Sequence, residues 1–364
     1  MIPLIVDLET EWRGGQNQAL LTAKGMRESG HDAQLVAIRD SPLAQRAAQA
    51  AIPVHQVDTS AKRARAALVL RKLLSQSQFD IVHANEPHAL TAAWLAGAHK
   101  KVPVVAARRV AYPLQKNVIA LRRYRTAKRI LAVSRFVAAS VVESGIPAGK
   151  VAVVYEGVEV PPMVAGEARE RARQRWSVAA DQRLLGCVGY LLPEKGQETV
   201  VRAMPAVRAK FPGARLLLAG DGSCRERLEA LAKQFGLQEA IIFTGFVEDV
   251  AQVYAALDIF VFPSLAEPLG TSLLAAMAWG LPVLAVASGG VPEYVDDGEN
   301  GLLVAESKPD LVTDGIVRLL SNDSLRENVG QKARRKMEGQ FSAACMVQNT
   351  LRAYQEILSE SRDG

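Results

Sequence analysis

The chain has 364 residues, of which 49% are apolar and 23% charged, and it carries a formal net charge of +6 at pH 7. This length exceeds what one hydrophobic core normally holds, so we expect two domains. Cys187, Cys224 and Cys345 are far apart and lack metal-ligand spacing, which favours a reducing compartment. No run approaches the roughly 18 apolar residues of a membrane-spanning helix, and residues 1–7 are typical of a first strand rather than a signal peptide. We expect a cytoplasmic protein, either soluble or peripheral on the inner face of the cytoplasmic membrane.

Positive charge is concentrated in the first half. Residues 1–156 hold 22 Lys and Arg against 11 Asp and Glu, a net charge of +11, whereas the remainder holds 22 against 27, a net charge of −5. Residues 108–129 contain eight cations and no acid. Basic helices with interleaved Leu, Ile and Tyr can lie on phospholipid, so this stretch predicts contact with an anionic membrane surface or an anionic acceptor. An ordinary solvated helix face is the alternative. We expect no nucleic-acid partner, because no nucleic-acid module accompanies the stretch.

Short apolar runs alternate with helical stretches in both halves, which is typical of parallel α/β layers. The clearest helix covers residues 15–29 and ends at Gly30. The join is expected at residues 156–179, where Pro161-Pro162 and a charged run interrupt the pattern. The predicted strands of the first half are residues 3–8, 33–38, 53–57, 80–83, 102–106, 129–133 and 151–154. Those of the second half are residues 183–188, 215–219, 240–244, 259–262 and 283–286.

Two such sheets bind ligands outside the carboxyl ends of their strands, which predicts site residues in the strand-to-helix loops. The segment from Glu267 to Gly280 carries the strongest signal, because a carboxylate and a glycine turn precede an apolar helix. The first turn of a helix offers unpaired N–H donors and partial positive charge. Gly270, Thr271 and Ser272 are therefore predicted to hold an anion, and Glu267 to accept bonds from hydroxyls. Met277 and Trp279 are expected in the core.

A second loop of this kind carries Lys195, which follows a predicted strand and is placed to neutralise a phosphate. The spacing of its glycines does not match a Walker loop. Phosphate and sugar are thus the ligand groups that the second half predicts.

Set in chain order, these pieces resemble glycosyltransferase family 4 over nearly the whole chain. The resemblance implies the GT-B fold, an α/β architecture of two facing Rossmann-like, doubly wound parallel-sheet domains with an interdomain cleft. It implies an acceptor domain at residues 1–160, a nucleotide-sugar donor domain at residues 161–340, and a C-terminal helix at residues 341–364 that packs back toward the first domain. The ordered fragments that carry it are Gly14-Gly15, Gly30-His31, Lys195-Gly196, Gly245-Phe246 and residues 80–84, 132–134, 156–159, 218–222, 262–264, 267–280 and 289–293.

The resemblance further implies a retaining, metal-independent transferase, with a hexose as the expected sugar and the nucleotide-sugar as co-substrate rather than cofactor. The acceptor expected from the basic first half is a cell-envelope glycan or lipid-linked glycan, such as lipopolysaccharide core. Carried over by position, Lys195 and Glu267 are the catalytic candidates, and both also bind donor. The other donor-binding candidates are Gly14, Gly15, Phe246, Val247, Gly270, Thr271 and Ser272, and the acceptor or cleft candidates are His83, Arg108 and Arg109.

The chain departs from the family pattern at two donor positions. Ala275 replaces the acid that usually accepts hydrogen bonds from the ribose hydroxyls. Tyr190 stands where many relatives have an Arg that binds the diphosphate together with Lys195. These changes motivate an alternative, a degenerate non-catalytic protein that binds a glycan or a partner. A Rossmann dehydrogenase is disfavoured, because no Gly-x-Gly-x-x-Gly follows the first strand.

Overall fold

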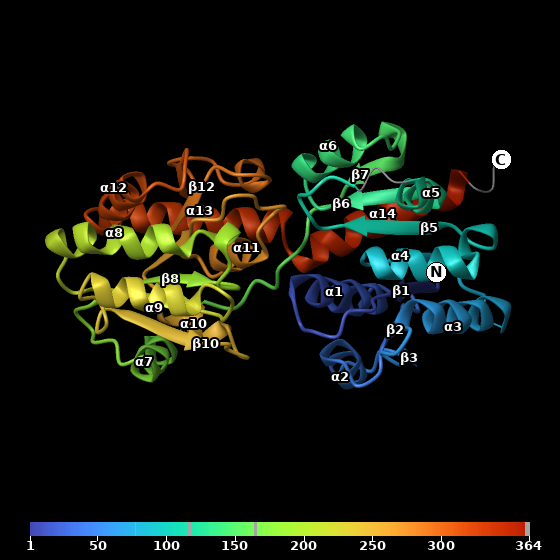
Figure 1. Cartoon of the computed structure of the whole chain (residues 1–364), viewed down its shortest axis with the longest axis horizontal. Helices are drawn as coiled ribbons and strands as arrows, with labels where there is room; N and C mark the ends of the chain where they lie inside the picture. The colour runs from blue at the N-terminus through green and yellow to red at the C-terminus, as the bar shows by residue number, and fades with distance from the viewer. Residues whose placement is uncertain (77, 115–117, 164–165, 361–364) are drawn as a thin grey trace. The chain divides into compact units, whose positions relative to one another are not determined.

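The computed structural model describes residues 1–76, 78–114, 118–163 and 166–360, which form two compact units (Figure 1). Unit 1 combines Met1–Gly157 with Ala343–Gly364, and unit 2 is Val158–Ser342. Both are parallel α/β structures, as the sequence predicts, and every predicted strand is present. Lys116 of the basic stretch lies outside the described residues.

Unit 1 contains a seven-stranded parallel sheet in the order β3-β2-β1-β4-β5-β6-β7. The order reverses beside β1, which makes the carboxyl ends of β1 and β4 the point where a doubly wound sheet binds ligands. The strands are β1 (Pro3–Val6), β2 (Gln34–Ile38), β3 (Val54–Val57), β4 (Ile81–Ala84), β5 (Val104–Arg108), β6 (Arg129–Ala132) and β7 (Val151–Val153). The helices are α1 (Gly14–Glu28), α2 (Pro42–Gln49), α3 (Lys62–Gln76), α4 (Pro87–Ala96), α5 (Val118–Thr126), α6 (Arg135–Glu143) and α14 (Ala343–Glu360), with short 3-10 turns η1 (Ala98–Lys100) and η2 (Ala148–Lys150).

Apolar side chains cover both faces of this sheet, because successive residues of a strand point to opposite sides. Leu4 and Val6 of β1 belong to a buried cluster with residues of α3, α4, α5 and α6. Ile5 belongs to the cluster on the other face, with residues of α1, α2 and α14. The C-terminal helix α14 is therefore part of the core of unit 1.

Unit 2 contains a six-stranded parallel sheet in the order β10-β9-β8-β11-β12-β13. The sequence did not predict β13, whose three residues follow a turn rich in Gly and Asn. The strands are β8 (Arg183–Val188), β9 (Ala214–Ala219), β10 (Ile241–Gly245), β11 (Ile259–Phe262), β12 (Val283–Val286) and β13 (Leu302–Val304). The helices are α7 (Gly166–Arg175), α8 (Gln197–Lys210), α9 (Arg225–Gln234), α10 (Ala251–Ala256), α11 (Thr271–Ala278), α12 (Pro309–Leu320) and α13 (Asp323–Gln340), with 3-10 turns η3 (Pro193–Lys195) and η4 (Val291–Glu293).

The packing of α14 onto α1 depends on a glycine. A Cβ built at Gly25 would lie 2.6 Å from Cγ2 of Val347, a residue that is 2% exposed. We expect Gly25→Leu to lower the free energy of unfolding by about 1–3 kcal/mol, because overfilling a packed contact forces side chains and backbone to shift. Gly339→Ala in α13 is the control, because a Cβ there meets no atom of the described residues within 4 Å. It should be neutral or stabilising by up to about 1 kcal/mol in urea denaturation, whereas equal stability of the two variants would contradict the packing.

Candidate functional site

Lys195 and Glu267, the two catalytic candidates, form an ion pair in unit 2. Lys195 ends η3 after β8, and Glu267 lies between β11 and α11. The Nζ–Oε2 distance is 2.7 Å, and the two side chains are 30% and 8% exposed respectively. Ser264 donates its hydroxyl hydrogen bond to the same Oε2 at 2.9 Å. The Glu267 carboxylate is thus held by a cation and a hydroxyl at the carboxyl ends of β8 and β11.

Two glycines allow the chain segments around this pair to touch. Gly196 has φ +69°, and a Cβ there would lie 2.2 Å from the carbonyl oxygen of Pro263. Gly289 has φ +57°, and a Cβ there would lie 1.9 Å from the carbonyl oxygen of Glu267. The next N–H, of Gly290, donates to that carbonyl at 2.9 Å. Only glycine fits at both positions, so the backbone itself fixes the Glu267 loop.

The first turn of α11 presents backbone donors next to this loop. Gly270 has φ +99° and its carbonyl accepts from the N–H groups of Leu273 and Leu274. The first N–H groups of an α-helix have no acceptor within the helix, and in α11 these belong to Thr271 and Ser272. These two donors, at the positive end of a helix, match what a phosphate requires.

Five further positions that the sequence relates to the nucleotide lie at or after the end of β10, after β8 and on α11. Gly245 ends β10 with φ +68°, Phe246 is 70% exposed and Val247 is buried. Tyr190 is 40% exposed, and Ala275 is half-buried on α11. The roles of these five positions toward a nucleotide stay predictions.

In unit 1, the first turn of α1, which begins with Gly14 and Gly15, is connected to the residue after β4 through a buried carboxylate. Asp7 is fully buried and accepts hydrogen bonds from Nε2 of Gln16 at 2.9 Å and Nδ2 of Asn85 at 2.7 Å. Asn85 also donates to the carbonyl of Gly15 at 3.0 Å. Burial raises the pKa of Asp7 above its ordinary value. These amide donors were missed in the sequence, because nothing local pairs Asp7 with Gln16 of α1 or with Asn85, which is 78 residues away.

Arg109 and His83 come close together in the same unit. Arg109 donates from Nε to Oε1 of Glu156 at 2.9 Å and from Nη1 to the carbonyl of Asn85 at 2.8 Å. Nδ1 of His83 lies 2.5 Å from the hydroxyl of Tyr354 on α14, and within the described residues its buried Nε2 has no partner. Burial, aided by Arg109, lowers the pKa of His83 to about 3, so the imidazole is neutral.

Arg108 differs from the expectation of a cleft residue. Its side chain is 3% exposed, and its guanidinium lies 4.8 Å from the ring centre of Tyr112 and 6.0 Å from that of Tyr124. It also donates to the Tyr112 carbonyl and, at 3.4 Å, to the Tyr124 hydroxyl. These contacts favour a structural role, because they surround the cation before any ligand arrives.

Glu86 caps α4 with a carboxylate that is largely withdrawn from water. It accepts from the N–H groups of Leu8 at 3.2 Å, of Ala89 at 2.6 Å and of His88. Burial, with the nearby charge of Asp7, raises the pKa of Glu86 to about 7. The sequence identified the neighbouring fragment at residues 80–84 but not this shift in pKa, which arises from burial and from the charge of Asp7.

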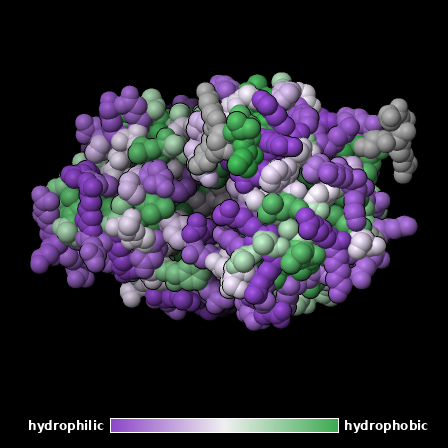
Figure 2. All heavy atoms as spheres, turned by 45° about the vertical axis from the view of Figure 1, so that its right-hand side comes forward, coloured by the Kyte–Doolittle hydropathy of each residue, from purple (hydrophilic) through white to green (hydrophobic). Residues whose placement is uncertain are grey.

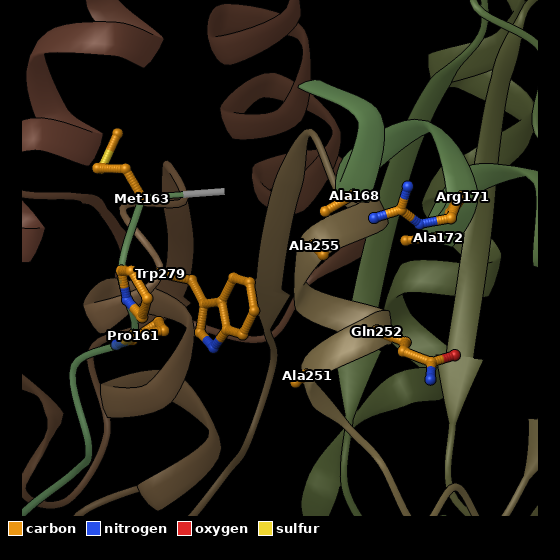
Figure 3. Close-up of a pocket in the computed structure, with 10 residues that line it drawn as sticks. Pro161, Met163, Ala168, Arg171, Ala172, Ala251, Gln252, Ala255 and Trp279 are labelled. Atoms are coloured by element: carbon orange, nitrogen blue, oxygen red, sulfur yellow. The ribbon is translucent and has the colours of Figure 1, made fainter. Parts of the chain in front are cut away.

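A separate groove of about 520 Å³ lies in unit 2 (Figure 3). It is lined by Pro161, Met163, Trp279 and alanines of α7 and α10. Trp279 is half-buried and stacks on Tyr254 at 6.2 Å, which corrects the expectation that it lies in the core. Because Trp279 follows the last residue of α11 and the phosphate-type donors start that helix, the groove is about 12 Å from them along the helix. It is not the Lys195–Glu267 site.

Two families match successive parts of the sequence. Residues 12–160 match Glycosyltransferase Family 4, and residues 168–336 match Glycosyl transferases group 1. A GDP-mannose-dependent alpha-(1-6)-phosphatidylinositol monomannoside mannosyltransferase of Mycobacterium tuberculosis is 30% identical over 292 residues, covering 75% of this chain and 74% of the relative.

Other relatives match over shorter stretches or by structure. A lipopolysaccharide core biosynthesis glycosyltransferase of Rhizobium meliloti is 32% identical over 187 residues, 51% of this chain and 53% of the relative. The chain spans about half the length of the first curated relatives it matches. The crystal structure of Anabaena HepE with UDP and glucose has a TM-score of 0.86 at 21% identity, covering 97% of this chain and 99% of that one.

The raised pKa of Glu86 predicts a pH-dependent stability. A carboxyl whose pKa rises from 4.5 to about 7 on folding favours the folded state most below pH 4.5, and that contribution is lost as pH rises through 7. We expect the stability difference, wild type minus Glu86→Gln, to become less favourable to wild type between pH 5 and pH 8 in urea denaturation. Glu143→Gln, at an exposed position on α6, is the control. A difference that does not vary with pH would contradict the predicted titration.

Proposed function

We propose a specific sugar transfer for this chain, which belongs to glycosyltransferase family 4, a family of nucleotide-sugar glycosyltransferases. The proposed reaction moves a hexose from a nucleoside-diphosphate donor to a cell-envelope glycan or lipid-linked acceptor, with retention at the anomeric carbon and without a metal ion. The observation that carries it is the 2.7 Å pair of Lys195 and Glu267 beside the first turn of α11.

The residue roles in the proposed transfer follow from where charge develops during the reaction. The bond between the anomeric carbon and the diphosphate oxygen breaks, so negative charge grows on the leaving phosphate. The acceptor oxygen forms the new bond and its proton passes to the departing phosphate. Lys195 and the N–H groups of Thr271 and Ser272 are placed to stabilise that phosphate, because fixed donors cost little reorganisation when charge appears. Glu267 is assigned to the sugar hydroxyls, as an orienting acceptor rather than a general base.

Relatives support the donor and acceptor classes. The Anabaena structure holds UDP and glucose, and the mycobacterial relative is GDP-mannose-dependent, so a hexose on a nucleoside diphosphate fits both. The Rhizobium relative acts in lipopolysaccharide core biosynthesis, and the mycobacterial one acts on a phosphatidylinositol mannoside. An envelope acceptor with an anionic or lipid part is the shared feature that we carry to this chain.

The surface of α5 supports location at an anionic membrane. Within the described residues, no helix is both long and apolar enough to cross a bilayer. Val118, Ile119 and Tyr112 are 81%, 64% and 61% exposed, and Arg122 and Arg125 are exposed on the same helix as the first two. On the face drawn in Figure 2, hydrophobic and hydrophilic side chains stand next to one another. Exposed apolar residues beside arginines are what a peripheral contact with anionic lipid requires.

Removing either member of the ion pair should abolish most transfer. We expect Lys195→Met and Glu267→Gln to lower the turnover of a nucleotide-sugar by about 10²- to 10³-fold, the usual loss when one charge-stabilising group is removed. Lys233→Met, at an exposed position on α9, is the control and should keep wild-type turnover. The measurement is release of nucleoside diphosphate across a panel of UDP-, GDP- and ADP-sugars.

Calorimetry with the same nucleotides separates the enzyme from the alternative. If the wild-type chain binds no UDP, GDP or ADP, free or sugar-linked, the hypothesis of a non-catalytic binding protein replaces the proposed sugar transfer. If it binds nucleotide and Lys195→Met turns over normally, then these two residues were assigned wrongly.

Membrane binding should depend on both apolar and basic residues of α5. We expect the double variant Arg122→Gln/Arg125→Gln to bind vesicles containing phosphatidylglycerol about tenfold or more weakly, because each basic residue near such a surface contributes about 1 kcal/mol. Val118→Ser/Ile119→Ser should weaken it too, whereas Leu68→Ser, which is 62% exposed on α3, should not. The measurement is vesicle co-sedimentation at low and high salt. Equal binding to neutral phosphatidylcholine vesicles would contradict the proposal.

A further inference from the structure

A cluster of cations lies at the carboxyl-end loops of unit 1, apart from the ion pairs already described. We call Lys62, Arg63, His88 and Arg123 the basic cluster. Lys62 and Arg63 begin α3, His88 lies in the first turn of α4, and Arg123 comes from α5. Lys62 and His88 both lie beside the carboxylate of Glu9, and Arg123 bonds to Thr91, one turn of α4 after His88. Burial and the charges of Lys62, Arg63 and Arg123 hold the pKa of His88 below its ordinary value.

Few acids offset this charge. Glu9 is the carboxylate within reach: its oxygens lie 3.8 Å from Nζ of Lys62 and 3.8 Å from Nε2 of His88. Neither contact is a direct charged hydrogen bond, which is about 2.7–2.9 Å long, so Glu9 offsets the charge of these cations only in part. Glu86 is nearby, but its oxygens already accept the N–H groups of Leu8, His88 and Ala89.

Arg123 adds one unsatisfied donor. Its Nη1 donates to the hydroxyl of Thr91, while its Nε is buried and has no partner within the described residues. A buried N–H of a guanidinium is costly to leave unpaired. An oxyanion on this side of α4 would satisfy it.

A cation is the competing occupant. The candidate ligand atoms of Glu9, Glu86 and His88 lie within 4.8 Å of one another. Two facts disfavour a metal ion there: the three cations around His88 would repel it, and Glu86 has its oxygens committed to backbone donors. A divalent metal would need a net negative site, and this one is net positive.

We propose that the basic cluster binds a phosphate group of the acceptor. This inference rests on the proposed transfer, since it names an anionic part of the molecule that receives the sugar. Phosphate offers several acceptor oxygens to a set of converging arginine and lysine donors, which a neutral hydroxyl does not. The phosphate belongs either to a lipid headgroup or to a phosphorylated soluble glycan.

Binding of inorganic phosphate to the full-length chain tests the site without any sugar transfer. The readout is the His88 imidazole signal in NMR, assigned with His88→Gln, during titration with phosphate against sodium chloride of equal ionic strength. We expect a saturable shift in the wild type that weakens about tenfold or more in Arg123→Gln and in Lys62→Gln, the loss typical of one charged hydrogen bond. Lys72→Gln, which removes an exposed charge further along α3, should leave it unchanged.

Further experiments distinguish the basic cluster from the donor site and identify the source of the phosphate. The shift should persist in Lys195→Ala, so a failure of nucleotide binding and a failure of this site are distinguishable. Competition by glycerol 3-phosphate against vesicles containing phosphatidylglycerol assigns the site to a lipid headgroup. Binding of glycerol 3-phosphate without such competition assigns it to a soluble phosphorylated acceptor. No saturable shift, an equal shift in Arg123→Gln, or a response to zinc but not to phosphate would overturn the proposal.

Discussion

The withdrawal of the Glu267 carboxylate from water is the constraint on which the unit 2 site depends. A carboxylate with an 8% exposed side chain is stable only if its charge and lone pairs are satisfied. Lys195 and Ser264 supply the partners, and Gly196 and Gly289 let the surrounding backbones come within contact distance. In the absence of a donor the two charges neutralise each other. In the proposed reaction, the donor would divide that pair, with the cation binding its phosphate and the carboxylate binding its hydroxyls.

Unit 1 also buries carboxylates, but it satisfies them with neutral hydrogen-bond donors rather than with a cation. Asp7 is held by side-chain amides, and Glu86 by backbone N–H groups, so neither carboxylate is neutralised by a direct ion pair. Burial therefore raises the pKa of both groups instead of being offset by a cation. The cations of this unit are left for other partners: Arg109 pairs with Glu156, while the basic cluster around His88 keeps an excess of positive charge.

The sequence predicts the strands well because buried parallel strands are short apolar runs between helical stretches, and both faces of each sheet demand such runs. It predicts the nearness of Lys195 and Glu267 because parallel strands end at one edge. It could not predict Ser264 or Asn85 as partners of carboxylates, since those pairings depend on which loops touch. The same limit explains Arg108 and Trp279, whose surroundings come from Tyr112, Tyr124 and Tyr254 rather than from local pattern.

Unit 2 has fewer charged groups for the nucleotide than the family resemblance implies, whereas the first half of the chain has an excess of positive charge. This difference affects how much binding energy comes from the nucleotide and how much from the acceptor. Ala275 and Tyr190 each stand where the family resemblance implies a charged group for the nucleotide, and one charged hydrogen bond contributes about 1.5–3 kcal/mol. If Lys195 is the remaining cation at the diphosphate, as proposed, we expect nucleotide affinity to come more from the backbone donors of Gly270–Ser272 and from apolar contact near Phe246. Unit 1, with a net charge of +11 over residues 1–156, has the opposite balance. The protein would then select its substrates mainly by recognising an anionic acceptor, and less by binding the nucleotide tightly.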